Sequence, residues 1–217
     1  ADVAAFAASP THHTLASGLD TTLADAVLNR SEGLDVIYDI EILKGDDANT
    51  GKLVAVGAVN DRLAILRFNA DLSLDQTFGQ GGGGITQTEL TQGVHGRAMT
   101  IDKTGRIYVV GGNKLARFLP GGQLDTEFGD NGYQTIWAGA DENNWTLWRE
   151  VIPTDVAIQP DGRILVSFKK EYHWGNFNTD RRLDVGGSTF HLARFTPAGQ
   201  PDGAVWDIDA GDYSTSG

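Results

Sequence analysis

The sequence predicts an all-β protein, a β-propeller built of four-stranded blades with three full repeats and a partial one at the N-terminus. A unit of about 50 residues recurs along the chain, as it does in propeller arrays. Short apolar segments alternate with glycine-rich turns, and no stretch has the periodicity of a long helix. The 28 glycines among 217 residues agree with a structure dense in turns.

An Arg-Phe pair marks each unit of the repeat. An aspartate follows each arginine after eight residues, which gives the pairs Arg67 and Asp75, Arg117 and Asp125, and Arg194 and Asp202. The first two arginines are 50 residues apart and the third follows 77 residues later, so the last unit holds 27 inserted residues. Several separate positions agree between the units, and this agreement indicates repeated structure rather than coincidence.

Each unit is expected to contain four short strands. The second unit shows them most clearly, at residues 99–102, 106–110, 115–118 and 132–136. A tight turn joins the first two strands, where glycine accepts a positive φ. The second strand is a continuous apolar run, which is typical of a strand buried on both faces.

The repeats also predict how the chain is divided. The segments are an N-terminal one with the tail of a partial blade (1–35), a first blade (36–88), a second blade (89–137) and a third blade with two aromatic-rich insertions (138–217). Propellers usually need four to eight blades. We therefore expect another chain to complete the ring, either a second copy or the remainder of a longer or cleaved polypeptide.

One stretch of the second unit carries a family resemblance. The pattern LARF, then PGGQLDTEFGDNGY, preceded by a pair of strands joined by a glycine turn, resembles the delta-60 repeat family of bacterial proteins. The resemblance extends over residues 36–212, and the third unit departs from it at 201–204. It implies a propeller-type repeat fold and a secreted or cell-surface location, but no particular reaction.

The repeated arginines and aspartates are expected to be structural. Each guanidinium should bind a turn carbonyl or the aspartate eight residues later, where its planar fork is useful. The alternative is that Arg67, Arg117 and Arg194 line a channel as anion sites. Function usually lies on unique loops rather than on repeated scaffold, which favours the structural role.

The two insertions, residues 138–151 and 169–189, are the unique part of the chain and are expected to be loops. They carry the candidate ligand-binding residues Trp145, Trp148, Tyr172, His173 and Trp174. Indole and phenol rings give a large contact area with one polar handle, which suits recognition of a sugar or a protein. The competing interpretation is that these rings cover the open end of a blade or pack the two loops together.

Calcium is the one cofactor that the sequence suggests, because acidic turns could bind it. Asp207, Asp209 and Asp212 loosely resemble an oxygen-rich calcium loop, although the distal glutamate of an EF-hand is missing. Solvated turns are the alternative, because Asp and Gly favour turns for their own reasons. No other cofactor is expected.

Composition narrows the class of partner. The formal net charge of −12 argues against nucleic acid, whose phosphates need a basic face. The absence of cysteine excludes disulfides and thiolate metal sites. No apolar run approaches the ~18 residues that a membrane-spanning helix needs.

The function most consistent with these patterns is a non-enzymatic extracellular recognition or structural module. The alternative is a propeller hydrolase or lyase that acts on carbohydrate, which would need convergent acidic groups or histidine. The insertions offer Glu142, Glu150, Glu171 and His173 for that role.

Overall fold

The computed structural model describes residues 36–44, 49–59, 62–88, 95–137, 147–176, 181–203 and 206–208. For residues 147–149, 172–176, 181–187 and 206–208 it describes the backbone alone. The expected partial blade at residues 19–23 therefore lies outside the described residues. Among the described residues, no helix is long and apolar enough to span a membrane.

The described residues form three antiparallel sheets of four strands each. Blade 1 consists of β1 (Val36–Ile42), β2 (Leu53–Val59), β3 (Arg62–Phe68) and β4 (Ile85–Gln87). Blade 2 consists of β5 (Ala98–Ile101), β6 (Ile107–Gly111), β7 (Lys114–Phe118) and β8 (Tyr133–Thr135). Blade 3 consists of β9 (Leu147–Ile158), β10 (Ile164–Asn176), β11 (Arg181–Phe195) and β12 (Trp206–Ile208).

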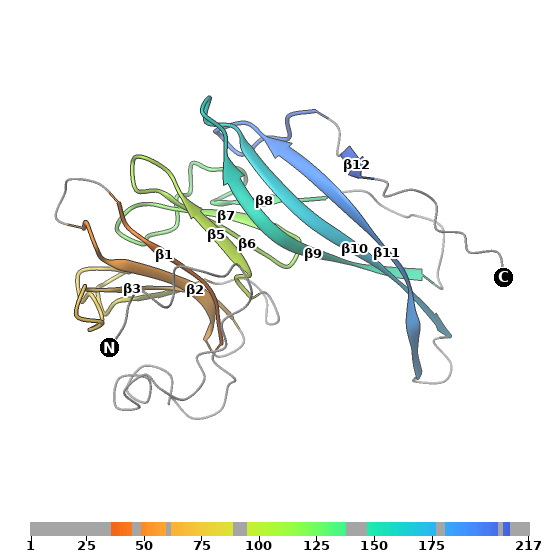
Figure 1. Ribbon diagram of the computed structural model, residues 1–217, viewed down its shortest axis with the longest axis horizontal. Helices are drawn as coiled ribbons and strands as arrows, with labels where there is room; N and C mark the ends of the chain where they lie inside the picture. The colour runs from red at the N-terminus through yellow and green to blue at the C-terminus, as the bar shows by residue number, and fades with distance from the viewer. Residues whose placement is uncertain are drawn as a thin grey trace.

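Strands that are consecutive in the chain are neighbours in every sheet, so each blade is a simple meander. The three sheets follow one another in space in chain order (Figure 1). The first strand of blade 2, β5, contacts both β1 and β9, so the first strands of the three blades gather together. The predicted all-β fold of four-stranded, propeller-type blades is confirmed.

Two of the three hydrophobic clusters lie between blades. Val54 and Val56 of blade 1 pack with Met99, Val109 and other residues of blade 2. A second cluster joins blade 2 to blade 3 in the same way. The third cluster belongs to blade 1 alone. Sheet-on-sheet packing of this kind explains why the middle strands read as continuous apolar runs.

A β-bulge shapes the start of the first strand in blade 1, where the register shifts between Ile37 and Asp39. The bulged backbone approaches Gly57 so closely that an added Cβ would lie 1.8 Å from the carbonyl oxygen of Val36. Gly111 meets His95 in the same way in blade 2, at 2.0 Å. Glycine recurs at this repeat position because no side chain fits there.

Blade 3 breaks this pattern and continues where the other blades turn. Phe168 stands at the position of Gly111, and two lysines replace the turn residues Gly112 and Asn113. Strand pairing therefore runs on to Asn176, and the hairpin of β10 and β11 extends well past the other sheets (Figure 1). The expectation of loops was wrong for residues 147–151, 169–176 and 181–189, which are strands, while residues 138–146 and 177–180 lie outside the described residues.

Candidate binding face and blade contacts

The repeated arginine of blade 1 joins two blades. Arg67 Nε donates a hydrogen bond to Asp75 Oδ2 at 2.7 Å, within its own blade. Its Nη1 donates to the backbone oxygen of Pro120 at 2.9 Å, in the turn that follows β7 of blade 2. The guanidinium also lies over the ring of Phe78, 4.6 Å from its centroid. The same side chain thus binds its own aspartate and the next blade.

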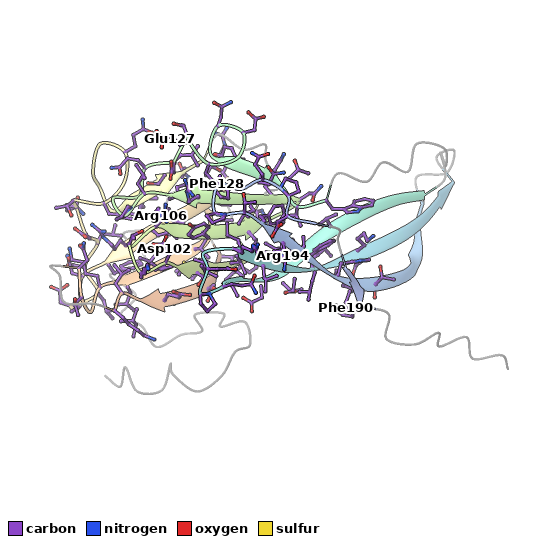
Figure 2. All side chains as sticks on the ribbon, turned by 90° about the horizontal axis from the view of Figure 1, so that it is seen from above. Asp102, Arg106, Glu127, Phe128, Phe190 and Arg194 are labelled. Carbon is purple, nitrogen blue, oxygen red and sulfur yellow. The ribbon has the colours of Figure 1, made fainter. Side chains whose placement is uncertain are left out.

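Blade 2 repeats the arrangement toward blade 3. Arg117 Nε donates to Asp125 Oδ2 at 2.7 Å, and Nη1 donates to the oxygen of Pro197 at 2.7 Å. The guanidinium lies 4.6 Å from the centroid of the Phe128 ring. Figure 2 labels Phe128 on the blade 2 side and Arg194 on blade 3. Two successive copies make this contact a property of the repeat.

The Phe-Gly element completes the contact between blades. The amide of Gly79 donates to Gly121 O at 2.8 Å, and the amide of Gly129 donates to Ala198 O at 2.9 Å. The acceptors lie in the turn after the third strand of a blade, which we call the docking turn: residues 119–123 in blade 2 and 196–200 in blade 3. Residues 69–73 are its counterpart in blade 1. The repeat spacing pointed to the aspartates, but it could not reveal that the acceptor carbonyls belong to the following blade.

The third arginine has a related but more exposed setting. Arg194 Nε lies 2.9 Å from Asp202 Oδ2, and Arg163 Nε lies 3.0 Å from the same oxygen. The Arg194 side chain is 29% exposed, against 5% for Arg67 and 8% for Arg117. The difference arises because blades 2 and 3 cover the first two arginines.

Trp148, Tyr172, His173 and Trp174, four of the five candidate ligand-binding residues, lie on the extension of blade 3. The backbone register of β9 and β10 places His173 opposite Trp148 and Tyr172 opposite Arg149, and Trp174 lies opposite Leu147. Four of the five candidates therefore share one pair of neighbouring strands. Trp145 lies outside the described residues. Sequence reasoning grouped these residues by composition, and strand pairing brings their backbones together.

A cluster that sequence reasoning missed joins β1 to the segment just before β5. The rings of Tyr38 and His95 stack with their centroids 6.2 Å apart, and the guanidinium of Arg97 lies 5.7 Å from the Tyr38 centroid. Tyr38 is the bulged residue of β1. Because His95 and Tyr38 come from different repeats, only the packing of blade 1 against blade 2 brings them together.

Carboxylates gather along the first strands. Asp39 Oδ2 accepts a hydrogen bond from the Met99 amide at 2.9 Å, which ties β1 to β5. Burial raises the pKa of Asp39, although the amides of Met99 and Ile40 oppose the shift. Burial, followed by the charge of Asp39, raises the pKa of Glu41 to about 7. The charge of Asp155 in β9 adds to both shifts, so a carboxylate of blade 3 acts on two carboxylates of blade 1.

The raised pKa of Glu41 predicts that the free energy of unfolding falls as the pH rises from about 4.5 to about 7. Over that range the unfolded chain releases the Glu41 proton while the folded chain retains it, so protons favour folding. The melting temperature should therefore be higher at pH 5.5 than at pH 8, and Glu41→Gln should shrink this difference.

Thermal melts at both pH values and one protein concentration would measure the effect. Glu127→Gln removes an exposed carboxylate and should leave the pH difference intact. An unchanged pH difference in Glu41→Gln would assign it to other groups. Asp75 does not titrate in this pH range. Burial alone would raise the pKa of Asp75, but hydrogen bonds from Lys52, Thr77 and Arg67 hold it below its usual value.

The calcium hypothesis receives no geometric support. Asp209 and Asp212 lie outside the described residues, and only the backbone of Asp207 is described, in β12. Among the side chains that the structure describes, no group of three or more histidine, aspartate or glutamate residues is arranged to hold a metal ion.

The meander sheets and the repeated contacts between them define a protein of the β-propeller class. A family described as "Domain of unknown function (DUF5122) beta-propeller" matches residues 48–78 of the chain. No curated protein and no solved structure matches the chain at a significant level.

Proposed function

We propose that this chain is a delta-60-type repeat propeller, exported by a bacterium, that acts as a non-enzymatic recognition module. The carrying observation is the unique extension of blade 3, where β9, β10 and β11 continue past the ends of the repeated strands. Repeated positions build the scaffold, whereas binding usually lies on the unique segments that a rigid scaffold presents.

The composition of the extension supports binding. Trp148, Tyr172, His173 and Trp174 lie on adjacent strands, and Trp145 precedes them by sequence. Phe190 of β11 is 52% exposed and projects from the margin of the molecule (Figure 2). Aromatic faces stack on sugar rings, and the rings need little ordering on binding because they have few rotatable bonds. Carbohydrate is therefore the ligand class to test first.

A carbohydrate-cleaving enzyme has weaker support. Glu150 and Glu171 are register partners on β9 and β10, so two carboxyl groups do occur side by side. Lys169 Nζ, however, contacts Glu171 Oε1, and this ion pair engages the more buried of the two carboxyl groups. A general acid instead needs a carboxyl group kept protonated in an apolar pocket.

The test is a glycan array followed by titration with the best glycan. Replacing Trp145, Trp148 and Trp174 together by alanine should abolish binding and leave the melting temperature within a few degrees of the parent. Ile42→Ser, which removes an exposed apolar side chain of blade 1 outside the extension, is the control and should bind normally.

Unfolding of the triple variant would assign the rings to packing and reject the proposal. Unchanged glycan binding would place the site elsewhere on the protein. Loss of capture of a protein ligand, with no glycan bound by the parent, would replace carbohydrate by protein as the ligand class.

A further inference from the structure

Blade 3 exposes a face that is covered in the other two blades. Tyr108, Val110, Leu115 and Arg117 of blade 2 are buried beneath blade 3. The matching residues of blade 3 are Leu165, Ser167, Leu192 and Arg194, and all four are half-buried. The described residues contain no further sheet beyond β9–β12. Blade 3 therefore has the residues of a blade-to-blade interface, and no sheet in the described part of the chain packs on them.

Blade 1 presents the other half of such an interface. Its docking turn has the same backbone hydrogen bonds as the others: Leu72 N donates to Asn69 O, as Gly122 N donates to Leu119 O. The apolar cluster behind this turn belongs to blade 1 alone and includes partly buried Phe68 and Ile85. Ala70 and Asp71 at the tip of the turn are exposed.

The two faces depart from the repeat in complementary ways. In blades 2 and 3 the docking turn has glycine with φ near +87°, and an added Cβ would lie 2.6 Å from the Phe78 ring or 2.8 Å from the Phe128 ring. Blade 1 has Leu72 there, with φ +66°. A blade with the repeated phenylalanine would therefore clash with Leu72. Blade 3 is the one unit whose sequence lacks this phenylalanine, with valine at 205.

The charge of the blade 1 docking turn also favours pairing with the exposed face of blade 3. Asp71 of the blade 1 docking turn replaces the neutral Gly121 and Ala198 of the other two turns. The exposed face of blade 3 carries Arg163 and Arg194, which share Asp202, and Arg163 also lies 3.3 Å from Asp161. Arg163 remains 45% exposed, so Asp71 of a second copy can approach it, and opposite charges across an interface favour the correct pairing.

We propose that two copies of this chain associate head to tail, with the exposed face of blade 3 in each copy docked on the docking turn and apolar cluster of blade 1 in the other. Arg194 donates to the backbone oxygen of Ala70 in the second copy, as Arg117 does to Pro197 within one chain. Two copies of the three blades that the structure describes make six, which lies inside the four-to-eight range of closed propellers, whereas three copies would make nine. The two-fold axis then runs along the centre of the ring.

Sedimentation equilibrium of the full chain tests this pairing. The parent should have twice the monomer mass of 23.3 kDa. Arg194→Glu damages one side of the interface, and Leu72→Asp damages the other side in an exposed turn far from blade 3. Each should raise the dissociation constant at least tenfold. Lys103→Glu makes the same charge change in the exposed β5–β6 turn and should remain dimeric.

Mixing the two damaged variants separates head-to-tail pairing from other dimers. Each variant alone has both interfaces damaged. The mixed dimer contains one intact interface, between Arg194 of one chain and Leu72 of the other, so mixing should restore association. A monomeric parent would overturn the proposal and assign the exposed face to another polypeptide. Folded variants that stay dimeric, or that fail to associate when mixed, would also overturn it.

Discussion

Replacing Arg117 with alanine is expected to lower the free energy of unfolding by about 3–5 kcal/mol, the range for removing one partner of a buried ion pair. The change leaves the buried carboxylate of Asp125 without its cation. It also removes the hydrogen bond to Pro197 O and the cation over the Phe128 ring, which join blade 2 to blade 3. Urea unfolding at fixed protein concentration would measure the loss.

A double-mutant cycle with Asp125→Ala isolates the pair. Removing either residue leaves the other as an unpaired buried charge, whereas the double variant leaves none. The double variant should therefore lose less stability than the sum of the two single variants, with a coupling energy of about 1–3 kcal/mol. Lys103→Ala, at an exposed turn, should stay within about 0.5 kcal/mol of the parent. Additive losses, or an Arg117→Ala protein as stable as the parent, would show that the pair does not hold the blades together.

The sequence predicted those parts of the fold that each repeat determines for itself. The turn at Gly105 and the apolar run of β6 depend on residues within a few positions of one another. The bond from Arg117 to Asp125 spans eight residues, and recurrence at the same spacing made it visible. Local chemistry repeated in each unit is the kind of information that a single sequence carries well.

Contacts between units could not be predicted in the same way. The Arg67 bond to Pro120 spans 53 residues, and no spacing within one unit reveals it. The stack of Tyr38 on His95 and the effect of the Asp155 charge on the pKa values of Asp39 and Glu41 also depend on how blades pack. Each of these residues looks ordinary in its own repeat, because the interaction exists only between repeats.

The extension of blade 3 was misread for a different reason. Residues 169–176 mix lysine, glutamate and aromatic side chains, with neither the alternation of a half-buried strand nor a continuous apolar run. Backbone pairing nevertheless continues, since Lys169 and Lys170 stand where blade 2 has its turn residues and cannot end the hairpin as glycine and asparagine do. The informative signal was the missing turn rather than the residues present.

The second large effect is expected from Gly122→Ala, which should cost about 2–4 kcal/mol. Part of the loss, about 1–2 kcal/mol, comes from a side chain at positive φ. The rest comes from the Phe78 ring, which the new Cβ would meet at 2.6 Å, so blade 1 must shift against blade 2. Gly81→Ala separates the two causes, because Gly81 has the same φ of +87° and open space around an added Cβ.

Urea unfolding of both variants should therefore give a clearly larger loss for Gly122→Ala than for Gly81→Ala. Adding Phe78→Val to Gly122→Ala should recover part of the difference, since the smaller side chain leaves room for the Cβ, even though Phe78→Val alone destabilises the core. Blade 1 already combines a larger residue, Leu72, with this turn. Equal losses for the two alanine variants would mean that glycine is required at the docking turn for its backbone conformation alone, and not for the close contact with the phenylalanine ring.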